Sequence, residues 1–218
     1  MLKFRLKLRN VAAIVACLAA TVVFSGCGKD DKEPPKDPLT YDEGVVINAV
    51  RWATRNVDKP GTFAAKPENP GLFYQWNSKV GWTAEVVPSD GKSVWNSEWN
   101  GNGAETWETD NCPCPEGWRL PTTEELESLL SSGHRWTNIP VKGAIFGTDD
   151  HTVFIPVASC INGATGTLFE WNGSSLWSGS SLRSDTAINL VMHANEDDVH
   201  VYSGDPRSYG LSVRCVKE

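Results

Sequence analysis

The sequence lacks the short motifs that identify common catalytic and nucleotide-binding sites. It contains no Gly-x-Ser-x-Gly, no phosphate-binding loop and no His-Glu-x-x-His. Internal repeats and heptads are absent as well. We therefore expect no catalytic residues, no cofactor and no bound metal, and we do not expect an enzyme.

Basic residues are also few. The chain has 20 Lys and Arg against 27 Asp and Glu, which gives a formal net charge of −7. The first 26 residues hold four of the basic residues and none of the acidic ones, so without them the charge is −11. Because nucleic acids and anionic headgroups repel such a surface, we expect no nucleic-acid partner.

Long apolar segments are missing apart from one run, from Val11 to Phe24, which is too short to span a bilayer comfortably. Basic residues precede it, and Ser25-Gly26-Cys27 follows it. This pattern predicts a signal peptide over residues 1–26. It resembles a bacterial lipoprotein signal, although Phe24 stands where that family usually has Leu. The alternative is an uncleaved helix with an incidental cysteine.

That resemblance implies cleavage before Cys27 and acylation of this residue with chains such as palmitate. The protein would then have the membrane as a partner through its N-terminal lipid. Residues 29–33 (KDDKE) resemble the tag that directs Bacteroidota lipoproteins to the outer face of the outer membrane. We therefore expect a surface-exposed outer-membrane lipoprotein. A charged spacer next to the headgroups is the alternative interpretation.

The rest of the chain divides into a tether and one folded domain. Residues 27–43 are charged and proline-rich with almost no apolar side chains, which predicts an extended tether. Residues 44–218 are enough for one domain with a substantial core.

Four cysteines fall in this predicted domain: Cys112, Cys114, Cys160 and Cys215. In an exported protein an even set favours disulfides. Cys112 and Cys114 are separated only by Pro113 and could not bridge without severe strain, so two pairings stay open. Zinc is less favoured, because Cys-Pro-Cys is tighter than the usual ligand spacing.

Turn residues recur every few positions and separate short β-rich segments, which predicts an α+β, β-rich fold. One helix is expected after Thr122, which forms a capping box with Glu125 ahead of three leucines on one face. Residues 131–133 (SSG) end it. The expected strands are 45–47, 50–52, 152–157, 167–171, the region around 176–177, 186–193, 199–202 and 211–216.

Several segments in series carry a resemblance to a known family. The most specific are Cys114–Thr122 (CPEGWRLPT), just before the predicted helix, and Gly210–Val216 (GLSVRCV) at the end of the chain. Four more lie between Val46 and Lys217: Arg51–Val57 (RWATRNV), Tyr74–Trp76 (YQW), Ile155–Ala158 (IPVA) and Leu176–Ser178 (LWS). Together they resemble the Fibrobacter succinogenes major paralogous domain family.

The resemblance implies a C-type lectin-like domain with short antiparallel strands, one or two short helices and long loops. It also implies a long disulfide between Cys114 and Cys215, which leaves Cys112 and Cys160 as the second bridge. Cys160 stands where the family usually has Gly.

Ten tryptophans are many for a domain of this size. Those in the shared motifs, Trp52, Trp76, Trp118 and Trp177, are assigned to packing. The others of interest lie in Gly-, Asn- and Ser-rich sequence and are the candidate ligand surface: Trp82, Trp95, Trp99, Trp107 and Trp171. The alternative is that these rings only hold long loops in place.

The sequence does not favour a metal site. Calcium-binding lectins use a Glu-Pro-Asn or Gln-Pro-Asp loop and a Trp-Asn-Asp strand, and neither is intact here. His193 and His200 flank a predicted turn and would make a zinc half-site if they shared a face. A change of one residue in the hairpin would place them on opposite faces, so exposed strand histidines are preferred.

The sequence thus favours a surface lipoprotein that presents a lectin-like binding or adhesion module for a glycan or a protein. One alternative is a cysteine-dependent oxidative enzyme related to the formylglycine-generating enzymes, with Cys112 or Cys114 as its thiol. Another is a structural or assembly component of the envelope.

Overall fold

The computed structural model describes residues 36–195 and 197–218, which form one compact unit beginning at Lys36. Cys27 and the predicted signal peptide lie outside the described residues. Within the described part of the chain, no helical segment combines the length and the apolar character that crossing a membrane requires.

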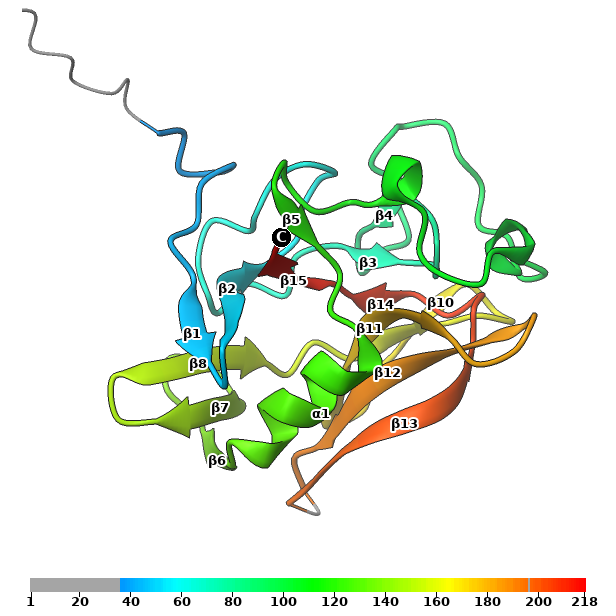
Figure 1. Ribbon diagram of the computed structural model, residues 1–218. Coiled ribbons are helices and arrows are strands. Elements are labelled where there is room, and N and C mark those ends of the chain that lie inside the picture. The colour runs from blue at the N-terminus through cyan, green and yellow to red at the C-terminus, as the bar shows by residue number, and fades with distance from the viewer. Residues whose placement is uncertain (1–35, 196) are drawn as a thin grey trace, which may run out of the picture. The chain divides into compact units, whose positions relative to one another are not determined.

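The fold is β-rich, as predicted, and the strands of the described residues form four sheets (Figure 1). The largest has the order β13-β12-β11-β14-β3-β4, and only the β11–β14 pairing is parallel. Its strands are β3 (Phe73–Tyr74), β4 (Gly81–Trp82), β11 (Gly173–Ser181), β12 (Thr186–His193), β13 (Asp198–Pro206) and β14 (Leu211–Ser212).

The other three sheets are smaller and antiparallel. One has the order β1-β2-β15-β5 and contains β1 (Val45–Ile47), β2 (Val50–Asn56), β5 (Trp118–Arg119) and β15 (Arg214–Lys217). A second contains β6 (His134–Thr137), β7 (Gly143–Thr148) and β8 (His151–Pro156). The third is the hairpin of β9 (Cys160–Asn162) and β10 (Thr167–Phe169).

The described helices are α1 (Thr123–Ser131) and two short 3-10 turns, η1 (Gly101–Gly103) and η2 (Thr109–Asn111). Helix α1 packs against β11, β12, β13 and β7 (Figure 1). Its capping box is present as predicted: the Thr122 hydroxyl accepts the Glu125 N–H at 3.3 Å, and the Glu125 carboxylate accepts the Thr122 N–H at 2.8 Å. Leu126 and Leu129 are fully buried, so this face of the helix forms part of the core next to the largest sheet.

Replacing Thr122 with Ala is expected to lower the free energy of unfolding by about 1 kcal/mol, because the Glu125 N–H loses its acceptor. Chemical denaturation measures this loss. Thr123→Ala changes the same residue type one position further on and should cost less, since no cap is removed. Equal losses for the two variants would contradict a role for the cap.

Two apolar clusters make up most of the core. One packs the α1 leucines against strand residues, including Phe146, Ile155 and Met192. The other gathers rings and sulfur atoms, including Trp76, Trp177 and Cys215. The four tryptophans assigned to packing are buried, which confirms their role: Trp52, Trp76, Trp118 and Trp177.

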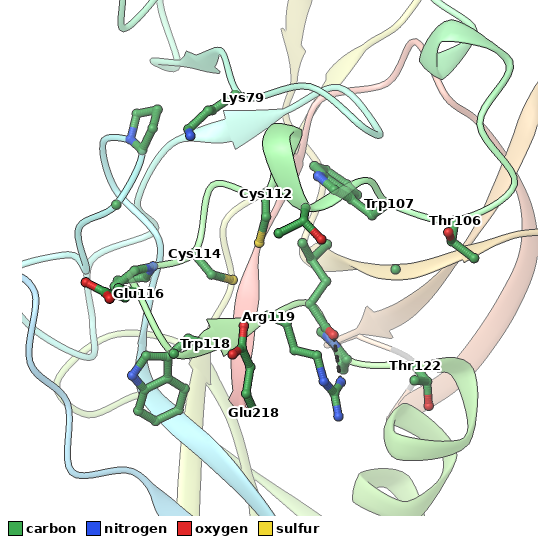
Figure 2. Close-up of a pocket in the computed structure, with 18 of the residues that line it drawn as sticks. Lys79, Thr106, Trp107, Cys112, Cys114, Glu116, Trp118, Arg119, Thr122 and Glu218 are labelled. Atoms are coloured by element: carbon green, nitrogen blue, oxygen red, sulfur yellow. Dashed lines mark hydrogen bonds between the residues drawn. The ribbon is translucent and has the colours of Figure 1, made fainter.

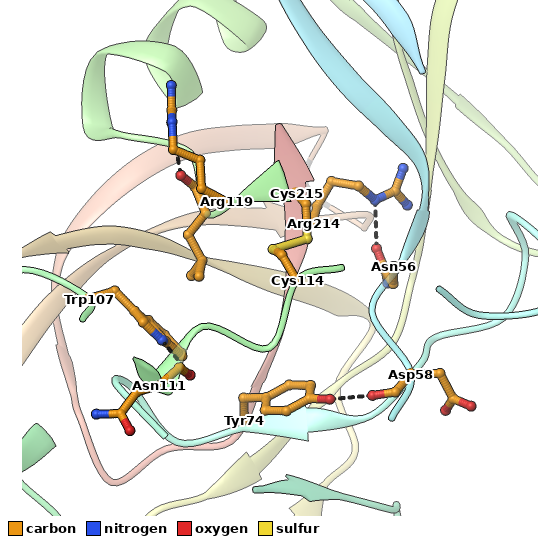
Figure 3. Close-up of a disulfide and its surroundings, with 10 residues drawn as sticks. Asn56, Asp58, Tyr74, Trp107, Asn111, Cys114, Arg119, Arg214 and Cys215 are labelled. Carbon is orange, nitrogen blue, oxygen red and sulfur yellow. Dashed lines mark hydrogen bonds between the residues drawn. A yellow bond between two sulfur atoms is a disulfide. The ribbon is translucent and has the colours of Figure 1, made fainter. Parts of the chain in front are cut away.

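A disulfide joins Cys114 to Cys215 and closes a separation of 101 residues (Figure 3). It connects the segment leading into β5 and α1 with the last strand. The expected second bridge is wrong: Cys112 and Cys160 are both free. Their surroundings give the reason, because Cys112 lies in the loop beside Cys114 and Cys160 lies on β9, where each lines a different pocket.

The last predicted strand is divided at Val213. Leu211–Ser212 joins the six-stranded sheet, and Arg214–Lys217 joins the four-stranded one. Leu211, Val213 and Cys215 alternate along this segment, and all three are buried in one cluster. Arg214 points the other way and is also fully buried. Its guanidinium donates to Asn56 at 2.8 Å, to the Ala53 carbonyl at 3.0 Å and to the Phe154 carbonyl at 3.1 Å.

The folded unit starts earlier than the sequence predicted. Residues 36–43, expected to be tether, contact β2 through the buried Asp42. Its carboxylate accepts the Thr54 N–H at 3.1 Å, the Thr54 hydroxyl at 2.8 Å and the Arg55 guanidinium at 3.1 Å. These hydrogen bonds order a segment whose composition alone is typical of a linker.

Candidate functional site

Two pockets contain the cysteines that were predicted to pair. We call them the thiol pocket, which includes Cys112, and the histidine pocket, which includes His193 and His200. Their volumes are about 760 and about 330 Å³, respectively.

The thiol pocket lies between the loop before α1 and the C-terminal residue (Figure 2). Its walls include the bridged Cys114, the rings of Trp107 and Trp118, and the Glu218 side chain. Arg119 also lines it, but its guanidinium is engaged by the Glu125 carboxylate at 2.8 Å through both nitrogens. Lys79, Glu116 and Glu218 also line the pocket, so charges of both signs remain in it.

Cys112 is the free thiol of this pocket. The pKa of Cys112 is raised, mainly by burial, and backbone hydrogen bonds offset only part of this rise. Because the thiolate is the reactive form, a raised pKa leaves little nucleophile at neutral pH. This environment differs from the electropositive one in which reactive cysteines are found.

The histidine pocket is built by strand alternation on one face of the largest sheet. Val191 and His193 are two residues apart on β12, and His200 and Tyr202 are two apart on β13, so each pair points to the same side. Val191 pairs with His200, so the side chains of the two strands lie next to each other on this face. The hairpin β9–β10 and the loop after it supply the opposite wall. The lining residues are Cys160, Asn162, Phe169, Trp171, Ser175, Val191, His193, His200, Tyr202, Asp205 and Tyr209.

Aromatic rings follow one another along this pocket. The Trp171 and His193 rings meet edge to face with centroids 4.9 Å apart. His193 and His200 stack at 5.8 Å with an angle of 18°, and His200 meets Tyr202 at 6.2 Å. Phe169 is 55% exposed and Tyr202 is 44% exposed, so part of this aromatic row is open to solvent.

Polar groups lie among the rings. Asp205 accepts a hydrogen bond from the Asn189 side chain at 2.9 Å, and burial raises the pKa of the Asp205 carboxyl. The Asn162 amide donates to the Tyr209 hydroxyl at 3.3 Å. These groups supply both donors and acceptors next to the aromatic rings of the pocket.

Cys160 is the free thiol of the histidine pocket. Burial, followed by the nearby charge of Asp205, raises the pKa of Cys160 to about 11. The sulfur therefore stays protonated at neutral pH and acts as a small apolar group.

Three side chains at the pocket's edge are close enough to share a metal ion. One ligand atom from each of His193, Asp198 and His200 lies within 4.8 Å of the others. The sequence favoured exposed strand histidines on the ground that a slip of one residue would separate the two imidazoles. The structure instead places them on the same face.

The five tryptophans of the predicted ligand surface do not gather in one place. Trp82 is only 3% exposed and packs against Trp95, whose indole N–H donates to the Gly163 carbonyl at 2.8 Å. The Trp99 indole donates to the Trp76 carbonyl at 2.7 Å. These three rings hold loops in place, which was the alternative interpretation.

The remaining two candidate tryptophans line different pockets. Trp107 lies in the thiol pocket and Trp171 in the histidine pocket. Of the predicted ligand surface, therefore, only Trp171 belongs to the aromatic row. The other aromatic side chains of this pocket, Phe169, Tyr202 and Tyr209, were not singled out from the sequence. The alternation along 199–202 could have indicated Tyr202, because it places Tyr202 on the same face of the strand as His200.

Comparison with known proteins adds no relative from which a function could be transferred: no family model, no curated protein and no solved structure matches this chain.

Proposed function

We propose that this chain is a surface-exposed outer-membrane lipoprotein, anchored through an acylated Cys27, whose domain has a C-type lectin-like fold and binds a glycan in the histidine pocket. Support for the fold comes from the Cys114–Cys215 disulfide, which ties the segment before α1 to the last strand. The resemblance in the sequence implies that same connection. The antiparallel pairing of β2 with β15, near the two ends of the domain, agrees with it.

The observation that carries the glycan proposal is the row of rings from Trp171 through His193 and His200 to Tyr202. A sugar ring has an apolar face of C–H groups that packs on an aromatic ring, and its hydroxyls need hydrogen-bond partners. Binding pockets are mostly apolar with a few placed polar groups. Asn162, Asp205 and Tyr209 provide such groups next to the rings.

Recognition is favoured over catalysis by the state of the two free thiols. The pKa values of Cys112 and Cys160 are both raised, mainly by burial. The oxidative alternative needs a free thiol that ionises readily, and neither cysteine has that character. We therefore propose binding without turnover.

A glycan array probed with the purified full chain tests this function, followed by calorimetric titration of the best ligand. Trp171→Ala should weaken binding at least about tenfold, because an aromatic anchor at the centre of a site contributes about 2 kcal/mol or more of affinity and about 1.4 kcal/mol is a factor of ten. Trp99→Ala is the matched control. It removes a half-buried indole outside the histidine pocket and should leave the affinity unchanged.

Thermal melts of both variants establish that each is folded at the temperature of the titration. The proposal fails if Trp171→Ala binds the glycan as tightly as the unmodified chain. It also fails if the array is blank while a protein ligand binds to a surface away from these rings.

A further inference from the structure

His193, Asp198 and His200 come from neighbouring positions of the hairpin β12–β13. In the strand register His193 pairs with Asp198, and Val191 pairs with His200. Residues two apart on a strand share a face, so all three side chains project from the same side of the sheet. One ligand atom from each lies within 4.8 Å of the other two.

The core fixes which face these residues occupy. Leu190, Met192 and Val199 alternate with them along the two strands and are buried in the cluster that contains the α1 leucines. A slip of one residue would bring the apolar set to the open face and bury the imidazoles. The hydrophobic core therefore holds the three polar side chains together.

We propose that His193, Asp198 and His200 form a binding site for a divalent transition metal ion, with Zn²⁺ as the preferred occupant. Imidazole nitrogen and carboxylate oxygen are ordinary zinc ligands at about 2.0–2.2 Å, which places ligand atoms roughly 3.4 Å apart around a tetrahedral ion. To reach this separation, the ligand atoms would have to move by about 1 Å. The His200 and Asp198 side chains are 39% and 47% exposed, so side-chain rotation alone allows it.

The ligand types argue against the hard cations. Ca²⁺ and Mg²⁺ prefer sites made of oxygen atoms, whereas two imidazoles with one carboxylate suit Zn²⁺, Cu²⁺ or Ni²⁺. Three protein ligands also leave one tetrahedral position for water or another ligand. His193 and His200 both line the histidine pocket, so that position would be at its rim. The metal site depends on the hairpin alone and not on glycan binding.

Neighbouring groups support the orientation of the rings. Trp171 contacts the His193 ring and Tyr202 contacts the His200 ring, with centroids 4.9 and 6.2 Å apart, respectively.

Charged groups of both signs lie near the turn: Asp197 contacts His134 at 3.5 Å, and Lys142 donates to Asn195 at 3.5 Å. His200 and Asp198 already lie 3.1 Å apart at the surface, where a contact of this kind contributes little stability by itself.

Calorimetric titration of the chelator-treated full chain with ZnCl₂, with no glycan present, tests the proposal. We expect one site per chain with a dissociation constant of about 100 µM or tighter. His193→Asn, Asp198→Asn and His200→Asn should each weaken it at least about tenfold, as expected when a ligand is lost. His151→Asn, which removes an exposed histidine on β8, is the matched control and should bind as the parent does.

A second measurement needs no variant and so does not depend on the folding of any substitution. In histidine NMR spectra of the parent chain, ZnCl₂ should shift the imidazole signals of His193 and His200, while the signal of His151 stays in place. Binding weaker than about 100 µM would overturn the proposal. So would an affinity that falls as much in His151→Asn as in His193→Asn, or shifts that miss His193 and His200.

Discussion

Replacing Cys215 with Ser is expected to lower the free energy of unfolding by about 3–5 kcal/mol. The Cys114–Cys215 bridge closes a separation of 101 residues. In the chain-entropy model, a cross-link of about that length reduces the freedom of the unfolded chain by about 4.7 kcal/mol. Cys215 is also fully buried in the cluster of rings around Trp76 and Trp177. Because domains are commonly stable by only about 5–15 kcal/mol, this loss is large.

Denaturant unfolding of the variant and the parent chain measures this difference, and Cys112→Ser serves as its control. Cys112 is also a cysteine and lies in the loop beside Cys114, but it is not bridged, so its replacement should have a much smaller effect. A reductant should destabilise the parent chain and leave Cys215→Ser unaffected. If the parent chain and Cys215→Ser unfold at the same denaturant concentration, the disulfide does not stabilise this domain.

Replacing Arg214 with Met is expected to cost about 3 kcal/mol or more. The buried guanidinium donates to the Asn56 side chain and to the carbonyls of Ala53 and Phe154. Burial lowers the pKa of Arg214 to about 9, so the charge itself is costly to bury. Met removes that cost but also removes all three hydrogen bonds, and we expect the loss of the hydrogen bonds to dominate.

The control for this prediction is Arg135→Met, which removes an exposed arginine from β6. Its effect should lie within about 0.5 kcal/mol of zero, as for most surface substitutions. Both variants are compared by denaturant unfolding. Near-equal stability of the Arg214→Met and Arg135→Met variants would show that the three hydrogen bonds contribute nothing net.

Features encoded by neighbouring residues were predictable from the sequence. The α1 cap depends on Thr122 and Glu125, three residues apart, and it forms as expected. Strand β12 has the predicted bounds because its alternating pattern is long. The Cys114–Cys215 bridge came from the family resemblance, since spacing alone left two pairings open.

Features that depend on distant segments were missed or wrong. The histidine pocket needs the β12–β13 register together with the β9–β10 hairpin, and no local pattern specifies how these meet. The prediction of a second disulfide was wrong because an even number of cysteines does not show which of them lie close together. Asp42 was assigned to a tether by composition, although its hydrogen bonds to β2 order it. Burial of Arg214 likewise follows from carbonyls on strands far along the chain.

If the histidine pocket binds the ligand, the indole N–H signal of a tryptophan in this pocket should respond to the ligand in NMR spectra. The chain has ten tryptophans, and substitution to Phe assigns the two that matter, Trp171 in the histidine pocket and Trp107 in the thiol pocket. On addition of the glycan selected by the array, we expect the Trp171 signal to shift and the Trp107 signal to stay unchanged. A shift of Trp107 with Trp171 unchanged would contradict it.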